Sequence, residues 1–188
     1  MHETSVGATV YAAWRNFFFG SLFRDYTDDD ELRLKMAGNY PFNDFIQRMI
    51  LTLGKDPENQ RFNRICAHGY IDYKGGKSCL YNFARALSDS FVFLSQSVSP
   101  EAKDWEWKNV HVNEYANMPW SLSPFKFLFH KEVPIGGNGN TVKVSKYSDS
   151  KVQQLKAFKA THTPNYKQVV SVSDDSRDSV MLYSHDGG

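Results

Sequence analysis

The spacing of apolar residues changes once along this chain, near Pro100, and this change limits the folds that the chain can adopt. Before Pro100, large apolar side chains recur every three or four residues, which is typical of amphipathic helices. After Pro100, they occur in short runs separated by turn residues, which is typical of strands. The helical stripes consist of Val6, Val10, Ala13, Trp14 and Phe17, then of Phe42, Phe45, Ile46, Met49, Ile50 and Leu53, and then of Leu80, Phe83, Ala84, Leu87, Phe91 and Leu94.

Local signals predict where these helices begin and end. Gly54 is expected to stop the second helix, because glycine takes the left-handed backbone conformation of a helix end easily. Ser78 can cap the start of the third helix, and Pro100 closes that helix. A shorter helix is expected over residues 28–36, where acidic residues suit the positive end of a helix dipole. Each stripe is predicted to face the hydrophobic core.

The second part of the chain predicts strands and turns. Strand-like runs cover residues 141–145, 166–172 and 179–183. The Asp- and Ser-containing stretch 174–178 separates the last two runs and predicts a hairpin. Residues 117–134 are rich in proline and aromatics, and predict an irregular packed loop.

These patterns together predict an α+β chain with two parts. A helical domain is expected over residues 1–100, and a mainly antiparallel β-rich part over residues 101–188. The length of 188 residues and the aromatic share of 15% are sufficient for a hydrophobic core. No repeat divides the chain further.

Charge and hydropathy exclude some classes of partner. The net charge is +1 and no run of Lys or Arg stands out, so binding to nucleic acid is not expected. The apolar stretches are much shorter than the ~20 residues that cross a bilayer, so no membrane partner is expected. The first residues show no signal-peptide pattern; either the protein is not exported or its true start lies elsewhere. The compartment is therefore left open.

The two cysteines, Cys66 and Cys79, could form one bridge, although buried free thiols are the expected state. With His68 they would offer three metal ligands. A structural zinc site normally needs four ligands at recognisable spacing. We therefore expect no metal here, and no other cofactor.

Glycines are densest in the string Gly-Gly-Asn-Gly-Asn-Thr-Val at residues 136–142. A phosphate-binding Walker loop would need a Gly-Lys-Ser/Thr end, and no lysine follows Gly139 directly. A dinucleotide fingerprint would need a third glycine that opens a helix, whereas residues 141–145 are predicted to be a strand. The string therefore predicts a tight turn that leads into a strand, with phosphate binding as the weakest alternative.

Aromatic and imidazole side chains in the second part have structural interpretations. Trp105 and Trp107 could expose both indoles on one face of a short strand, but packing into the core is favoured. None of the later histidines lies in a recognised catalytic motif, and each is expected to be a hydrogen-bonded structural residue. These histidines are His111, His130, His162 and His185.

Three strings in the second part resemble the C-terminal region of penicillin acylase-type amidases in order and spacing. Residues 105–111 match the family's Trp-x-Trp-Gly-x-x-His, with Lys108 in place of glycine. Residues 136–142 match a Gly-Gly-Asp/Asn-Gly-Asp/Asn-Thr-Val strand entry. Residues 160–170 are similar to a His-Gly-Pro-Ser-Tyr-Arg-Gln string, with Lys167 in place of arginine.

The start of the chain extends this resemblance. Residues 5–14 are similar to the start of the family's helical insertion, so the resemblance covers nearly the whole chain. It implies an αββα sandwich with helical insertions, produced by self-cleavage of a precursor. In such N-terminal-nucleophile hydrolases, a new N-terminal serine attacks an amide carbonyl and its own α-amino group acts as the base. Backbone and Asn donors stabilise the oxyanion. The implied substrates are small linear amides, such as β-lactam side chains and acyl-homoserine lactones.

The resemblance also implies that the nucleophilic serine is not in this chain. The family's nucleophile lies upstream of the matched strings, and Ser5 lies in a helix-like run without a recognisable cleavage junction. Because the family continues beyond Gly188, the chain is expected to be truncated at both ends. Its expected partner is the missing N-terminal part of the precursor. The candidates for polar residues that support the active site from behind are Asn138, Asn140 and Thr141.

The predicted function is therefore that of a fragment of an amidohydrolase that cleaves linear amide bonds. The alternative is a non-catalytic accessory or interaction protein that retains the scaffold and turns aromatic surface toward a partner.

Overall fold

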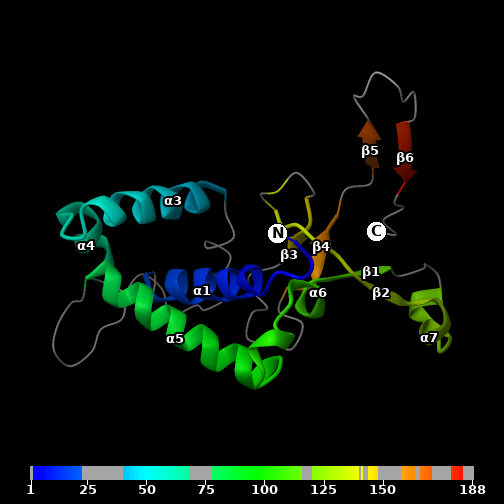
Figure 1. Cartoon of the computed structure of the whole chain (residues 1–188). Helices are drawn as coiled ribbons and strands as arrows, with labels where there is room; N and C mark the ends of the chain where they lie inside the picture. The colour runs from blue at the N-terminus through cyan, green and yellow to red at the C-terminus, as the bar shows by residue number, and fades with distance from the viewer. Residues whose placement is uncertain are drawn as a thin grey trace.

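The structure is a computed structural model that describes residues 2–22, 40–67, 78–115, 120–139, 141, 144–147, 158–163, 166–170 and 179–183. The long helices come first and the short strands follow, so the predicted α+β class is confirmed (Figure 1). The helices are α1 (Val6–Leu22), α3 (Tyr40–Lys55), α4 (Gln60–Cys66), α5 (Cys79–Ser97), η1 (Ala102–Asp104), α6 (Trp107–Val110), η2 (Trp120–Leu122) and α7 (Lys126–Phe129). The strands are β1 (Val112–Tyr115), β2 (Lys131–Pro134), β3 (Lys146–Tyr147), β4 (Ala160–His162), β5 (Tyr166–Val170) and β6 (Ser179–Tyr183).

Helix α1 lies at the centre of the helical part and packs along α5 (Figure 1). Its aromatic residues form the main contacts: Trp14 stacks on Phe18 at 5.4 Å, and Phe18 meets Phe83 of α5 edge-on at 4.7 Å. Because α1 has neighbours on more than one side, residues outside the predicted stripe are also buried. Among them are Ala8, Ala12, Phe18 and Phe19.

The helix predicted over residues 42–53 is confirmed as α3, with two local errors. The buried stripe is narrower than predicted: Ile46, Met49 and Leu53 are buried, whereas Ile50 is exposed. Gly54 does not end the helix, which continues to Lys55. The residues expected to form a helix over 28–36 lie outside the described residues.

Helix α5 is confirmed, but its inner face was predicted only in part: Leu94 is buried and Phe83 packs on Phe18, as expected. Ser78 caps its start by accepting a hydrogen bond from the Tyr81 N–H, as predicted. The predicted stripe residues Leu80, Leu87 and Phe91 are nevertheless exposed. Besides Leu94, the buried face carries smaller residues, which let α5 approach α1 closely. These smaller residues are Cys79, Asn82, Ala86 and Ser90.

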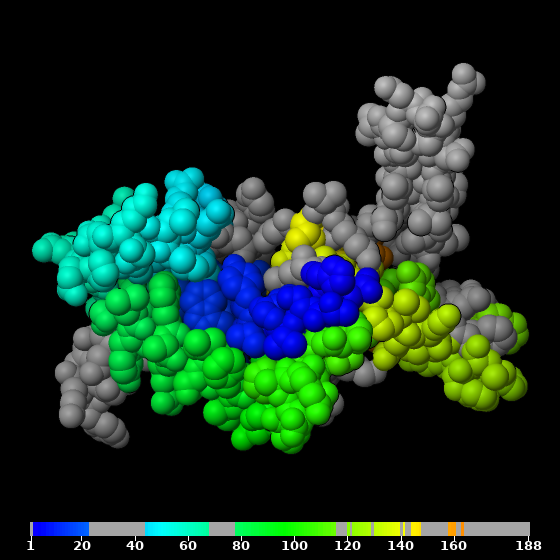
Figure 2. All heavy atoms as spheres, viewed as in Figure 1, coloured from blue at the N-terminus to red at the C-terminus, as the bar shows by residue number. Residues whose placement is uncertain are grey.

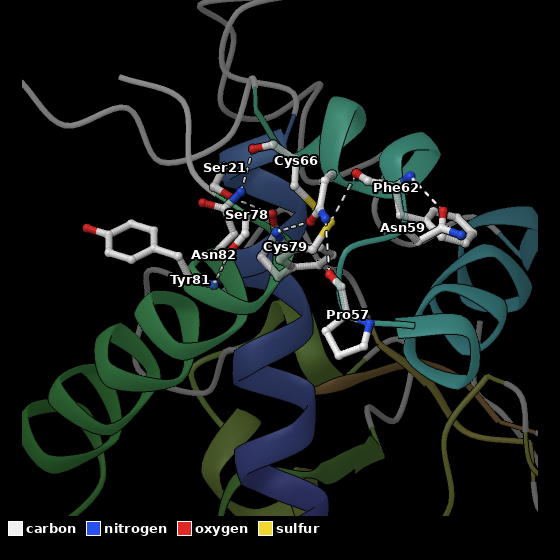
Figure 3. Close-up of a disulfide and its surroundings, with 11 residues drawn as sticks. Ser21, Pro57, Asn59, Phe62, Cys66, Ser78, Cys79, Tyr81 and Asn82 are labelled. Atoms are coloured by element: carbon white, nitrogen blue, oxygen red, sulfur yellow. Dashed lines mark hydrogen bonds between the residues drawn. A yellow bond between two sulfur atoms is a disulfide. The ribbon is translucent and has the colours of Figure 1, made fainter. Parts of the chain in front are cut away.

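A disulfide explains how α5 is oriented. Cys66 at the end of α4 is bonded to Cys79 at the start of α5, with the two Cα atoms 5.0 Å apart (Figure 3). The expectation of free thiols is therefore wrong, because the fold brings these two helix ends together. The Asn82 side-chain amide donates to the Cys66 carbonyl beside this bond. The disulfide and this hydrogen bond thus hold the face of α5 that carries Cys79 and Asn82 against its neighbours.

One hydrophobic cluster joins the two parts of the chain. It contains Ala12 and Ala13 of α1 and Leu94 of α5, together with Trp107 and Phe158 from beyond Pro100. The core is therefore continuous across residue 100. The division into domains 1–100 and 101–188 stays a prediction from sequence.

The described strands form three separate two-stranded antiparallel sheets. β1 pairs with β2, β3 with β4, and β5 with β6. The hairpin predicted from the last two strand-like runs is confirmed by β5 and β6, although its loop, 174–178, lies outside the described residues. The strand predicted over residues 141–145 is wrong in its described positions. There, Val144 makes a single bridge to Asn138, and β3 begins only at Lys146.

The segment predicted as a packed loop, 117–134, contains regular structure between its described residues. It includes η2, α7 and β2. Several of its described apolar side chains are not packed: Leu122 is 82% exposed and Phe127 74% exposed. Helix α7 stands out at one end of the molecule (Figure 2). A hydrophobic residue on such a protrusion has few neighbours to cover it.

Two further predictions concern the whole architecture. Mixed helix and strand agree with the α+β class, but the αββα sandwich stays a prediction, because each described sheet has two strands. Among the described residues, none of the helices combines the length and the apolar composition that crossing a membrane requires.

Candidate functional site

The glycine-dense string forms a tight turn, as predicted. Gly137 has a φ of 89°, a conformation that side chains with a Cβ rarely adopt. The Asn138 N–H donates to the Thr141 hydroxyl oxygen at 2.8 Å, and the Thr141 hydroxyl lies 3.1 Å from the Asn138 carbonyl, to which it donates. The Ser145 N–H donates to the same carbonyl at 3.0 Å. These bonds hold both sides of the turn together.

The turn contains the three residues predicted to support an active site. Asn138 is buried and Thr141 is half-buried, and their mutual hydrogen bonds place them side by side. Asn140 lies outside the described residues. The structure therefore brings two of the three candidates together, while their part in catalysis stays a prediction.

Trp107 fastens the turn to α6. Its indole N–H donates to the Gly137 carbonyl at 2.9 Å, and its ring is fully buried. The ring stacks on His111 at 4.6 Å and contacts Phe158 at 5.5 Å. The residues around Trp107 are not a strand, since η1 precedes them and α6 begins at Trp107. Trp105 is also buried, so the packing interpretation of this pair is confirmed.

His111 links the turn region to the segment before β4. Its Nδ1 is hydrogen-bonded to the Phe158 carbonyl, so Nδ1 carries the proton. Its Nε2 then accepts a hydrogen bond from the Ser145 hydroxyl at 2.7 Å. The prediction that His111 is a structural, hydrogen-bonded residue is confirmed. Sequence reasoning missed Ser145, because no periodic pattern marks a polar residue that faces inward from a turn.

The Ser145–His111 pair has the atoms of a nucleophile and its base. Both side chains, however, are completely buried. A substrate carbonyl needs access to within about 3–3.5 Å of the attacking oxygen. In this structure the Ser145–His111 pair therefore supports the surrounding backbone and does not act as a nucleophile and base.

Glu3 ties the start of the chain to the same turn. Its carboxylate accepts a hydrogen bond from the Gly136 N–H at 3.1 Å. Its backbone carbonyl accepts one from the Lys108 N–H at 2.8 Å. Nothing in the local sequence predicts either bond, because the partners lie more than a hundred residues away along the chain.

Ser5 serves as the cap of α1. Its hydroxyl oxygen accepts a hydrogen bond from the Ala8 N–H at 3.2 Å. Its own nitrogen is a peptide N–H that donates to the His2 carbonyl at 3.1 Å. An N-terminal nucleophile needs a free α-amine as its base, and Ser5 has an amide instead.

Two alternative chemistries find no support in the described geometry. The turn leads into the Val144 bridge and β3 rather than opening a helix, so it lacks the helix end that binds phosphates. Cys66 and Cys79 share a disulfide, so neither has a thiolate to offer a metal. His68 lies outside the described residues, as do the side chain of His162 and the whole of His185.

Comparison with known proteins tests the family resemblance that the sequence strings indicate. No curated protein and no solved structure was found to match the chain. A family model described as penicillin amidase matches residues 1–187, which include the Trp107 segment, the glycine turn and the β5 strand. Since the match covers almost the whole sequence, the chain belongs to the penicillin amidase family.

Proposed function

We propose that this chain forms part of an amidohydrolase that cleaves linear acyl-amide bonds in small molecules, with its nucleophilic serine on polypeptide outside this chain. The match to the penicillin amidase family over residues 1–187 carries the proposal. In this function, residues 1–100 supply a helical insertion and residues 101–188 supply strands of an αββα sandwich. The antiparallel pairs β3–β4 and β5–β6 are the described strands that such a sandwich would incorporate.

The assignment of the nucleophile to other polypeptide rests on the state of the serines near the site. Ser5 lacks a free α-amine and uses its hydroxyl oxygen to cap α1. Ser145 is buried, and its hydroxyl donates a hydrogen bond to His111 Nε2. An N-terminal-nucleophile hydrolase needs an exposed serine whose own amine accepts the proton.

The glycine turn is proposed to hold an active-site wall in place. Catalytic geometry must be kept within fractions of an ångström, so groups behind the reacting atoms need rigid support. Asn138 and Thr141 close the turn, and Trp107 anchors it from α6. In this role the turn does not contact the reacting bond, and it acts through the strand that follows it.

The alternative function is a non-catalytic accessory or interaction protein. One observation favours it: the apolar side chains on and beside α7 are exposed, with Leu122 82% and Phe127 74% accessible. Exposed apolar patches mark surfaces that bind partners. The same patch would also be covered in a larger amidase, so the two functions need a direct test.

The first test examines the gene upstream of Met1. The genomic frame upstream of Met1 is read, and its full product is expressed and assayed with a chromogenic acyl-amide. The amidase proposal predicts a Ser-Asn-x-Trp-like subunit start and turnover that disappears when that serine is replaced by alanine. An in-frame stop immediately before Met1 would contradict it and support the accessory function.

The second test uses the purified chain alone. We expect no hydrolysis of the chromogenic acyl-amide above the buffer rate. Turnover that is lost in Ser5→Ala, but kept in Ser145→Ala, would place the nucleophile at Ser5 and overturn the proposal that it lies elsewhere. A folded state must be verified by circular dichroism for both variants.

A further inference from the structure

A second group of polar side chains lies on the β1–β2 pair, apart from the glycine turn. Glu114 of β1 and Glu132 of β2 are directly opposite each other in the antiparallel register. His130 lies just before β2, and its Nε2 is 2.8 Å from Glu114 Oε1 and 4.0 Å from Glu132 Oε1. All three side chains are partly buried. Of these three residues only His130 stands out in the sequence, because the strand register that places the two glutamates opposite each other is not visible there.

Two carboxylates in directly opposite positions repel each other, so this arrangement needs a cation. The Lys159 ammonium now supplies it: Nζ contacts Glu114 and lies 3.5 Å from Glu132 Oε1. Lys126 of α7 is a more distant cation, with Nζ 4.0 Å from Glu114 Oε1.

We propose that Glu114, His130 and Glu132 form a binding site for a divalent transition-metal ion such as Zn²⁺, which enters by displacing the Lys159 ammonium. One ligand atom of each residue lies within 4.8 Å of the other two. Around a tetrahedral Zn²⁺, with bonds of about 2.0–2.2 Å, ligand atoms are roughly 3–4 Å apart. The three side chains therefore need only small rotations to bind one ion.

The ligand types select the class of metal. An imidazole nitrogen with two carboxylates suits Zn²⁺, Co²⁺ and their neighbours, whereas Mg²⁺ and Ca²⁺ prefer oxygen ligands alone. Two carboxylates also balance the charge of a divalent ion. Three protein ligands leave a fourth position open, which is the arrangement of zinc sites that bind water.

Displacement of Lys159 is sterically possible. Its side chain is 29% exposed, and a lysine stem can turn its ammonium toward water. Two features limit the affinity. The metal must compete with an ammonium already in place, and His130 Nδ1 is buried without the hydrogen-bond acceptor that usually orients a ligating histidine. We therefore expect micromolar rather than tighter binding.

The experiment is a calorimetric titration of the untagged, full-length chain with Zn²⁺. We expect one saturable site in the wild type and none for Mg²⁺. His130→Gln and Glu132→Gln should each weaken binding about tenfold or more, since even partners behind metal ligands change affinity by this much. Lys159→Met should bind Zn²⁺ more tightly, because the competing cation is gone.

Matched controls change the same residue types elsewhere. His2→Gln and Glu101→Gln alter exposed residues and should leave the affinity unchanged. Circular dichroism checks that each variant is folded; if Lys159→Met is not, the two ligand variants still decide the question. Zinc affinity that is equal in the wild type, His130→Gln and Glu132→Gln would overturn the proposal. So would the absence of saturable Zn²⁺ binding to the wild type.

Discussion

The helical cluster around Trp14 and the turn region around Trp107 are held together in different ways. In the first, aromatic and aliphatic side chains of α1, α3 and α5 interlock, and a disulfide secures one end. In the second, the buried Trp107 indole and the buried His111 imidazole hold the turn region through hydrogen bonds to backbone carbonyls and a serine. Apolar packing is spread over many residues, whereas the hydrogen-bonded region depends on a few.

This difference predicts where single substitutions act. A truncation in the helical cluster should lower the stability of the fold without altering one loop selectively, because neighbouring side chains share the lost contacts. A truncation in the turn region should also release a specific segment of backbone. Regional hydrogen exchange distinguishes these outcomes.

The largest effect is expected from Trp107→Ala. Removing this buried ring should lower the free energy of unfolding by about 3–5 kcal/mol, measured by urea denaturation. Phe18→Ala, in the helical cluster, should cost a similar amount. Only Trp107→Ala should speed the exchange of the amide hydrogens near Gly137 and Ser145 in conditions where the protein remains folded. Equal exchange at these amides in the two variants would remove the distinction between the regions.

The next effect tests the disulfide. Replacing Cys66 and Cys79 together by alanine should lower the free energy of unfolding by about 3 kcal/mol, because the bridge closes a loop of moderate length. Faster exchange should be confined to the end of α4 and the start of α5. An unfolding curve of the wild type that is unchanged by reductant would contradict the prediction.

A smaller effect is expected from Ser145→Ala. The substitution removes the hydroxyl that donates to the buried His111 Nε2, which should cost about 1–3 kcal/mol in urea denaturation. Ser95→Ala removes an exposed hydroxyl and should change stability by less than about 0.5 kcal/mol. If both variants are equally stable, the His111–Ser145 bond does not support the turn region.

The smallest effect concerns the cap of α5. Ser78→Ala should cost about 1 kcal/mol, because the Tyr81 N–H loses its acceptor. Ser78→Asp keeps a capping oxygen and should restore most of the stability. Thermal unfolding of the three proteins at equal concentration measures the differences, and a loss in Ser78→Asp equal to that in Ser78→Ala would argue against capping.

Sequence periodicity was sufficient to predict that α1, α3 and α5 exist, but it did not predict which face of α5 is buried. Leu80, Leu87 and Phe91 have helical spacing, and hydrophobicity alone would turn them inward. The bond between Cys66 and Cys79 and the small residues facing α1 reverse that choice. Such a reversal depends on a contact between two helices, which the pattern within one helix does not contain.

The candidate site was predictable only in part. Glycine density predicted the turn, and the family resemblance indicated Asn138 and Thr141. Both signals are local in the sequence. Ser145 and Glu3 were missed, since each acts through a partner far along the chain. The glutamate pair of β1 and β2 was missed for the same reason, because strand register decides which side chains are opposite.

The hydrogen bond from Gly136 to Glu3 has a consequence for the order of folding. It joins residues 133 positions apart, so its formation closes a very long loop of chain. Closing such a loop costs entropy before any contact compensates for it, and contacts between distant residues slow folding. Pulse-labelling during refolding should therefore find α4 and α5 protected early and the Gly136 amide among the last to become protected.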